Sequence, residues 1–301
     1  MTNSSQPPRL PIDPLHVKRQ FDRRGDLDAA EFIYGEIAQR MLDRLKLIRL
    51  EPKVILDAGC GPGKRFVALR ARYPQATLVG LDHNKKLLGL AKQSVKGSIW
   101  HKILAPLGRQ SSIDLVEAEL DATGLAPESV DLIWSNLAIH WHPAPHDVLR
   151  EWSRLLRPDG LAFFTVWGPD TARELRTALM QANLQTATLP FVDMHDLGDL
   201  MVEQGFKDPV MDQERITLTY DSAGPLLADA HALGGNANPL RRAGLTSRAW
   251  RDRLISALEA NRQDGKLTLT LEIAYGHAWR GATRRQAGET RISLQAISRK
   301  S

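Results

Sequence analysis

The chain has 301 residues, of which 43% are hydrophobic and 25% are charged, so its length and composition allow a globular protein with a sizeable core. It holds one cysteine, Cys60, which excludes an internal disulfide and a cysteine metal cluster and fits a reducing, cytoplasmic location; it has no run of roughly eighteen apolar residues that would predict a membrane span. The formal net charge of +5 favours acidic partners, among which nucleic acid, an acidic carrier protein and an anionic small molecule are all open.

The first half of the chain alternates between short apolar runs and helical patterns. Residues 1–16 are polar and proline-rich and lack the apolar stretch of a secretory signal, so we expect a mobile tail there. A helix is predicted over 29–47, where apolar residues recur at helical spacing. The alternation that follows predicts a mostly parallel sheet covered on both faces. Its expected strands are 54–56, 77–81, 113–118, 130–134 and 161–167, and its expected helices are 66–73, 85–94 and 144–156.

The regular alternation of strands and helices ends after residue 167. The helices between the last two expected strands could form a cap over the sheet edge where a ligand would bind. The residues after 282 are basic and polar and predict no element. In this part of the chain, helices are predicted over 171–183, 194–204, 222–233 and 247–261, and strands over 213–220 and 267–278.

The strongest local pattern is the glycine-rich segment that follows the first expected strand. Gly59, Gly61 and Gly63 lie between a strand pattern and a helix pattern, where glycines allow a tight turn and a close approach of the backbone to a ligand. Their G-x-G-x-G spacing differs from the G-x-G-x-x-G of dinucleotide-binding enzymes. Asp57 precedes them, and a carboxylate there suits a cationic ligand such as S-adenosylmethionine, which carries a sulfonium and an α-amino group. A plain structural turn is the alternative.

A second acid, Asp82, ends the next expected strand. A carboxylate at that position can accept hydrogen bonds from both hydroxyls of a ribose. It could also cap the helix that begins at Lys85, and the two roles can coexist. Together with the glycine turn, Asp82 is good evidence for a nucleoside-containing ligand.

Two further segments follow strands and so belong to the same sheet edge. In the acidic segment 117–121, Glu119 or Asp121 could accept a hydrogen bond from an adenine amino group while Leu120 covers the ring, although a solvated acidic loop is the alternative. In segment 134–141, Asn136 could bind the amino acid part of the cofactor through its backbone or its side chain, and His140 and Trp141 could line a substrate pocket or could simply pack.

At this point the chain resembles a known class of enzymes. Residues 54–167 are similar to the class I methyltransferase core, a Rossmann-like α/β sheet with helices on both faces that binds S-adenosylmethionine. The similarity is carried by the segments 57–63, 131–138 and 156–160. It implies the cofactor and leaves the methyl acceptor open.

A narrower resemblance covers most of the chain, to the malonyl-acyl carrier protein O-methyltransferases of bacterial biotin synthesis. It implies a cofactor-closing segment at residues 17–22, with Phe21 as its aromatic member, and a helical cap near the C-terminal strands. Two features depart from the family: an arginine-rich segment after Asp22, and Glu119 where an aspartate is usual. The segments that carry the resemblance are 134–138 with Trp141, 168–175, 191–198 with 205–206, 232–236, 242–246 and 267–275.

The family resemblance implies methylation of the free carboxylate of malonyl-acyl carrier protein or malonyl-CoA, with no nucleic acid or membrane as partner. A carboxylate has a pKa near 4 and is ionised at neutral pH, so the reaction needs no general base and we assign none. An arginine is the natural partner for the substrate anion. The candidates are Arg241, Arg242, Arg248 and Arg251 in the expected cap, with Arg242, His140 and Trp141 as substrate-pocket residues.

Besides methylation of a malonyl thioester, two other functions stay open. The expected organisation of the chain is the same for all three functions. A methyltransferase acting on a quinone or a phenol would need a base, for which His140 would serve. A complex I assembly factor that resembles a protein hydroxylase shares several of the same segments, so an assembly role is also open. The expected organisation is a flexible tail and cofactor-closing segment at 1–28, a cofactor-binding core at 29–170, cap helices and closing strands at 171–282, and a basic tail at 283–301.

Overall fold

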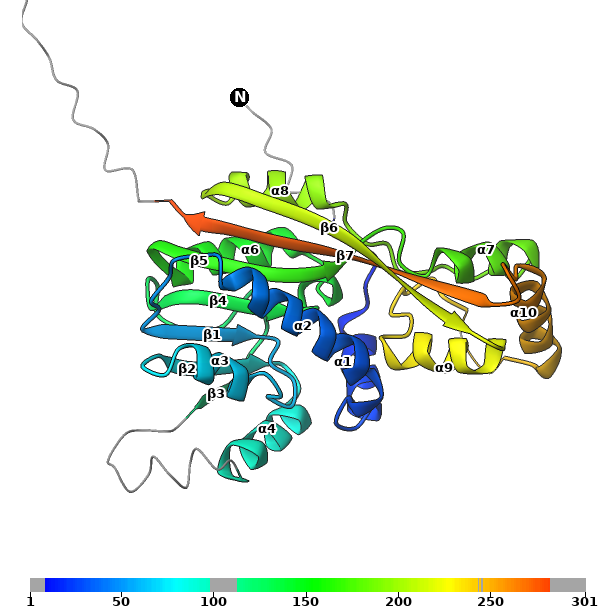
Figure 1. Ribbon diagram of the computed structural model, residues 1–301, viewed down its shortest axis with the longest axis horizontal. Helices are drawn as coiled ribbons and strands as arrows, with labels where there is room; N and C mark the ends of the chain where they lie inside the picture. Colours follow the sequence, from blue (N-terminus) through cyan, green and yellow to red (C-terminus); the bar gives the residue numbers. More distant parts are fainter. Residues whose placement is uncertain (1–8, 98–112, 243, 245, 282–301) are drawn as a thin grey trace, which may run out of the picture.

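One mixed sheet runs through the computed structural model, which describes residues 9–97, 113–242, 244 and 246–281. Within those residues the sheet has seven strands in the order β3-β2-β1-β4-β5-β7-β6 (Figure 1). Strands β1 to β5 are parallel, and β7 runs antiparallel to both β5 and β6. The strands are β1 (Val54–Ala58), β2 (Thr77–Asp82), β3 (Asp114–Glu117), β4 (Val130–Asn136), β5 (Leu156–Trp167), β6 (Phe206–Tyr220) and β7 (Leu267–Arg280).

Helices cover both faces of the sheet, as the alternating pattern predicted. Successive side chains of a strand point to opposite faces; Ile55 of β1 therefore packs in one apolar cluster and Leu56 in another. The first cluster joins the sheet to α2 (Glu31–Leu45), α3 (Phe66–Arg72) and α4 (Lys85–Gly97), and the second joins it to α6 (Pro145–Leu155) and α8 (Met194–Glu203). The predicted Rossmann-like α/β sheet with helices on both faces is confirmed.

The segment expected to close over the cofactor, at 17–22, lies in a helix that begins within the expected tail at 1–16. Helix α1 (Pro14–Arg23) begins after Asp13, whose carboxylate accepts hydrogen bonds from the backbone amides of Leu15 and His16. An aspartate N-cap followed by proline is a helix-start signal that the polar composition concealed. Ile12 and Val17 are buried against Trp141, which fixes this helix on the sheet edge. Residues 1–8 of the expected tail, and the expected basic tail at 283–301, lie outside the described residues.

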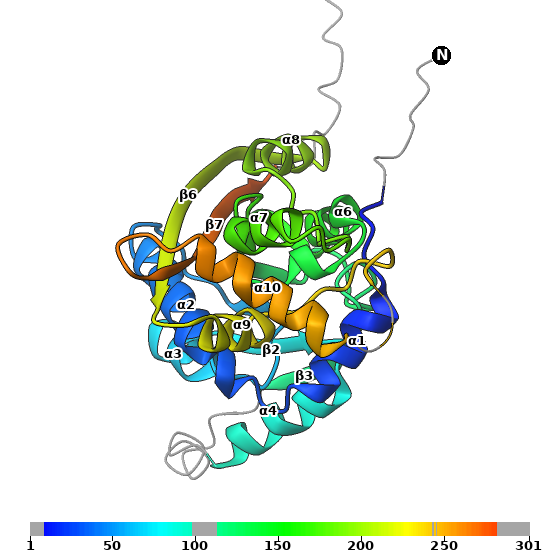
Figure 2. The ribbon, with the colours of Figure 1, turned by 90° about the vertical axis from the view of Figure 1, so that its right-hand side faces the viewer.

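Strands β6 and β7 form a ribbon that extends beyond the rest of the sheet. Strand β6 begins at Phe206, earlier than the predicted start at residue 213. The prediction began too late because Pro209 interrupts the alternating pattern. The strand continues through Pro209 with a register shift, which an edge strand tolerates. Helices α9 (Ala223–Ala232) and α10 (Arg248–Ala260) connect the two strands and gather with α7 (Arg173–Gln181) at the far end of the ribbon (Figure 1). Figure 2 looks onto this group of helices, the cap.

Candidate active site

A cavity of about 460 Å³, here called the first pocket, lies at the carboxyl ends of the parallel strands. This edge is where open α/β sheets bind their ligands. Helix α1 and the 3₁₀ helix η3 (Ile139–Trp141) contribute its outer wall. Among the predicted site residues, those that line it are Phe21, Gly59, Gly61, Asp82, Glu119, Leu120 and Trp141; Asp57, Gly63, Asn136, His140 and Arg242 do not.

Close packing requires glycine at two positions of the turn after β1, whereas the third is open to the pocket. All three have positive φ angles, of +81° at Gly59, +54° at Gly61 and +73° at Gly63. A Cβ on Gly59 would lie 2.4 Å from the Cβ of Ala138, and a Cβ on Gly63 would lie 2.4 Å from the ring of Phe66. A Cβ on Gly61 would meet only Leu27, at 3.7 Å, so here the backbone conformation and the pocket, and not packing, favour glycine.

Asp82 joins the glycine turn to the next helix through backbone hydrogen bonds. Its Oδ2 accepts from the amide of Gly61 over 2.8 Å, and its Oδ1 accepts from the amide of Asn84 over 2.8 Å. The N-terminus of α4 is capped by Asn84, whose Oδ1 accepts from the amides of Lys86 and Leu87. The proposed capping role of Asp82 is therefore indirect, and Asn84 is the residue that sequence reasoning missed.

Asp57 is a buried carboxylate that lacks a cation. Its Oδ2 has no hydrogen-bond partner within the described residues, and burial, with the negative charge of Asp82 nearby, raises its pKa to about 8. An arriving positive charge would stabilise the ionised form of both carboxylates. Asp57 lies behind the glycine turn and does not line the first pocket, so a cationic ligand in that pocket would act on it across the turn.

The two candidate acids for an adenine both line the first pocket, and each lies beside a histidine. The Oε2 of Glu119 is 3.4 Å from Nδ1 of His83, and the Oδ1 of Asp121 is 3.4 Å from Nε2 of His142. The hydrogen bond from His83 lowers the pKa of Glu119, so this carboxylate is ionised and accepts hydrogen bonds only.

The side chain of Asn136 is engaged in contacts within the fold and does not line the first pocket. Its Nδ2 donates to the backbone oxygen of Tyr34 over 3.0 Å, and its Oδ1 accepts from the hydroxyl of Thr165 over 2.9 Å. The side chain thus ties β4 to α2 and β5. Leu137, with a φ of +53°, and Ala138 line the first pocket in its place.

His140 is buried in an aromatic environment. Its ring centroid lies 5.0 Å from that of Trp141, and 5.9 Å from those of Trp167 and Phe191. Neither ring nitrogen has a hydrogen-bond partner among the described residues, and burial lowers the pKa of the imidazole to about 3. His140 therefore stays neutral at physiological pH and lines neither large pocket.

A second pocket of about 510 Å³ lies between the cap and the sheet. It is lined mainly by apolar side chains of α7, α9, α10 and the ribbon, including Leu175, Leu227, Trp250 and Leu271. Trp141 lines both pockets and so stands between them, with its ring packed against the backbone of Gly234.

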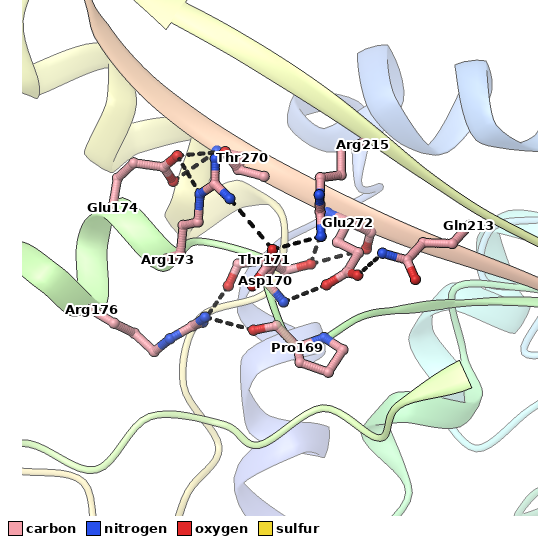
Figure 3. Close-up of polar contacts among 10 residues, drawn as sticks. All are labelled: Pro169, Asp170, Thr171, Arg173, Glu174, Arg176, Gln213, Arg215, Thr270 and Glu272. Atoms are coloured by element: carbon pink, nitrogen blue, oxygen red, sulfur yellow. Dashed lines mark hydrogen bonds and ion pairs between the residues drawn. The ribbon is translucent and has the colours of Figure 1, made fainter. Parts of the chain in front are cut away.

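Three arginines line the second pocket, and two of them, Arg241 and Arg242, were candidates from the sequence. Arg242, a predicted residue, is exposed there, and Arg241 donates to the backbone oxygen of Asn238. Arg176, which the sequence did not single out, donates to the backbone oxygens of Thr171 and Pro169 (Figure 3). The other two candidates, Arg248 and Arg251, are exposed on α10 and do not line the pocket.

A buried glutamate, Glu272, holds the segment that carries Thr171 into the wall of the second pocket. The carboxylate of Glu272 on β7 accepts hydrogen bonds from the amide of Asp170 and from the side chain of Gln213 (Figure 3). Its backbone oxygen accepts from the hydroxyl of Thr171, a pocket residue, over 3.0 Å. These contacts fix the chain where it leaves β5 for α7.

No candidate metal site accompanies these pockets: within 9–97, 113–242, 244 and 246–281, no group of three or more His, Cys, Asp or Glu residues could hold an ion. In the same described residues, no helix is both long and apolar enough to cross a membrane.

The parallel sheet, the glycine turn and the acid at the end of β2 define an S-adenosylmethionine-dependent methyltransferase, and a family model described as a methyltransferase domain matches residues 56–164. Relatives described as malonyl-[acyl-carrier protein] O-methyltransferases, from Methylovorus sp. and Laribacter hongkongensis, are 40% and 42% identical to this chain. These alignments cover 91% and 90% of this chain and 91% of each relative. The chain belongs to the malonyl-[acyl-carrier protein] O-methyltransferase family.

A solved structure shows the same fold at low sequence identity. The phosphoethanolamine N-methyltransferase 2 of Haemonchus contortus, in complex with S-adenosyl-L-methionine, is similar with a TM-score of 0.54 and 16% identity. The similarity covers 88% of this chain and 60% of that one. The cofactor of the present protein is S-adenosylmethionine, and the unpartnered carboxylate of Asp57 beside the turn fits its positive charge.

Proposed function

We propose that this protein methylates the free carboxylate of a malonyl group carried by an acyl carrier protein or by coenzyme A, as an early step of biotin synthesis. The observation that carries the proposal is the adjoining pair of pockets that share Trp141. One pocket has polar groups suited to the cofactor, and the other is apolar with arginines at its wall. The relatives named malonyl-[acyl-carrier protein] O-methyltransferase support this choice of acceptor. No nucleic acid or membrane takes part in the proposed reaction.

The cofactor-binding roles follow from the first pocket. Asp82 would accept hydrogen bonds from the ribose, the turn at Gly59 and Gly61 would approach the amino acid part, and Asp57 would balance its positive charge. Leu120 would cover the adenine, and Phe21 on α1 would close the pocket from outside. Gly63 and Asn136 would act through the backbone that they position.

The chemistry requires positioning more than proton transfer. When bound, the cofactor would supply a methyl group on a sulfonium, whose S–CH3 bond would break as the O–CH3 bond of the ester formed, leaving S-adenosylhomocysteine. The acceptor carboxylate is already ionised at neutral pH and has no proton to lose. The protein must hold the carboxylate in line and exclude water. The buried, neutral His140 outside both pockets agrees with a site that uses no histidine base.

The surface of the cap suits an acidic carrier protein that presents the malonyl group as methyl acceptor. Helix α10 presents Arg248 and Arg251 to solvent, while Trp250 and Leu254 of the same helix line the second pocket. A carrier protein held by the exposed arginines could therefore deliver its acyl group into the pocket. Attraction of this kind mainly accelerates encounter.

Turnover with isotope-labelled S-adenosylmethionine tests the proposal directly. Malonyl-carrier protein and malonyl-CoA should each gain one labelled methyl group as an ester that mild base removes. An equimolar acetyl thioester should gain none, because it lacks the free carboxylate. Transfer of label to a phenol or a quinone, with none to malonyl thioesters, would overturn the proposed acceptor and leave the class of enzyme unchanged.

A further inference from the structure

Arg24 lies immediately after helix α1, with its guanidinium held between two aromatic rings. The guanidinium carbon is 4.8 Å from the ring centroid of Phe21 and 5.6 Å from that of Trp141. Its Nη2 donates to Oε1 of Gln20 over 3.2 Å. These contacts hold the positive charge against the side chains that wall the first pocket.

The guanidinium has an unused hydrogen-bond donor. Its Nη1 is buried without a hydrogen-bond partner, and within the described residues no carboxylate forms an ion pair with Arg24. By contrast, the nearby Lys64 and Arg65 are paired with Asp28 and Glu31. Burial lowers the pKa of Arg24, which shows that the charge is held at a cost in solvation. A buried donor left without a partner points to a ligand that completes it.

Arg24 itself lines neither pocket, but the side chains it contacts lie along the wall that the two pockets share. Trp141 lines both. Tyr34 lines the first pocket and donates from its hydroxyl to the backbone oxygen of Leu233, which lines the second, over 2.9 Å. Gln20, the partner of Arg24, packs beside Gly235 of the second pocket. The guanidinium of Arg24 therefore lies directly behind side chains that separate the two pockets.

We propose that Arg24 binds a carboxylate at the junction of the two pockets, and that this carboxylate is the methyl acceptor. The inference rests on the proposed function, because transfer between ligands in adjoining pockets requires the reacting atoms to meet at their junction. A guanidinium offers the carboxylate paired, charge-assisted hydrogen bonds and fixes its plane. Arg24 thus takes the role for which the sequence suggested Arg241, Arg242, Arg248 and Arg251 in the cap.

Two carboxylates can reach this junction: that of the malonyl group and that of the amino acid part of the cofactor. Calorimetry on the full chain separates them without turnover. In the substrate arm, malonyl-CoA and acetyl-CoA are titrated into protein saturated with S-adenosylhomocysteine. In the cofactor arm, S-adenosylhomocysteine is compared with methylthioadenosine, which lacks the amino acid part.

The variant Arg24→Gln should weaken malonyl-CoA binding by roughly tenfold or more, as expected for a lost hydrogen bond to a charged group. Acetyl-CoA, S-adenosylhomocysteine and methylthioadenosine should bind as they do to the unaltered protein. Arg24→Lys should restore part of the malonyl affinity. The matched control is Arg23→Gln, which removes the exposed arginine next in the chain and should change nothing.

The outcomes divide cleanly. A loss confined to S-adenosylhomocysteine would support carboxylate binding by Arg24 and assign the carboxylate to the cofactor, which overturns the acceptor role. Equal loss for malonyl-CoA and acetyl-CoA, without rescue by lysine, would reduce Arg24 to a packing residue, and unchanged affinities would overturn the proposal altogether. If the unaltered protein itself fails to distinguish malonyl-CoA from acetyl-CoA, the proposed function fails independently of Arg24. Thermal melting checks that each variant folds.

Discussion

The backbone amide of Gly61 donates a hydrogen bond to Oδ2 of Asp82 over 2.8 Å, joining the turn after β1 to the end of β2. Replacing Asp82 by alanine should release the turn and remove the proposed ribose acceptor. The affinity for S-adenosylmethionine should fall about 10- to 100-fold, from hydrogen bonds to a charged group worth roughly 1.5–3 kcal/mol. Titration calorimetry measures this; the exposed Asp114→Ala on β3 is the control, and equal affinities in both variants would contradict the assignment.

The glycines of the turn should respond differently to substitution. In Gly59→Ala the new methyl would overlap Ala138, so the free energy of unfolding should fall by about 1–3 kcal/mol. In Gly61→Val the side chain has room in the free protein but lies in the first pocket at a positive φ, so cofactor binding should be lost with a smaller loss of stability. Chemical denaturation and calorimetry on both variants separate the effects. A reversed order would show that the pocket does not hold the cofactor.

His140 should act on stability at low pH and not on catalysis. Its pKa of about 3 in the folded protein lies below 6.5, so between these values the unfolded chain binds the extra proton. This residue therefore destabilises the protein progressively as pH falls from 6.5 towards 3, and has no such effect above 6.5. His140→Phe should show a shallower loss of unfolding free energy on acidification, measured by denaturant titration at several pH values.

The same variant tests the absence of a base. His140→Phe should retain most of the methylation rate with an unchanged pH profile, because the acceptor carboxylate has no proton to lose. A drop of roughly 10²- to 10⁴-fold, as for removal of a general base, would instead favour a phenol or a quinone as acceptor.

The exposed arginines of α10 should affect the carrier protein more than a small thioester. Charge reversal at Arg248 and Arg251 should raise KM for malonyl-carrier protein, and added salt should do the same, since screening weakens long-range attraction. Malonyl-CoA should respond less to both changes because it lacks the acidic protein surface. Lys92→Glu, an exposed change on α4, is the control. Identical salt dependence for the two substrates, together with inert charge reversals, would argue against docking on the cap.

The contacts of Glu272 predict a link between stability and the second pocket. Glu272→Ala would leave the amide of Asp170 and the side chain of Gln213 without their shared acceptor. The free energy of unfolding should fall by about 1–3 kcal/mol. KM for malonyl thioesters should rise, because Thr171 lines the pocket, while the affinity for S-adenosylmethionine stays unchanged. A cofactor affinity that falls in parallel would mean that the two pockets are not independently supported.

The half of the molecule that binds the cofactor could be predicted from the sequence because its determinants are local. The apolar run from Val54, the glycines that follow it and the acid at Asp82 each specify a turn or a strand end within a few residues. The structure places these strands and helices within a few residues of the predicted positions, apart from an earlier start of β5 at Leu156.

The residues that depend on distant neighbours could not be predicted. The guanidinium of Arg24 contacts the rings of Phe21 and Trp141 only because the fold brings these two residues together. No spacing in the sequence predicts the contact between Arg24 and Trp141. Asn136 follows a strand, as a ligand-binding residue would, yet its side chain turns to Tyr34 and Thr165. Local sequence patterns specify the position of a residue in a strand, helix or turn, whereas tertiary packing determines which residues its side chain contacts.

The length of the ribbon has a consequence for how such an enzyme diversifies. Strand β7 pairs with β5 from Ile273 to Trp279, but from Leu267 to Glu272 it pairs with β6 alone. The cap helices α9 and α10 are therefore connected through a two-stranded extension, away from the strands that carry the glycine turn. Insertions or exchanged helices at that tip would reshape the second pocket while leaving the strands and the glycine turn of the first pocket in place. Changes in the cap can therefore alter the choice of methyl acceptor while the strands that carry the glycine turn stay unchanged.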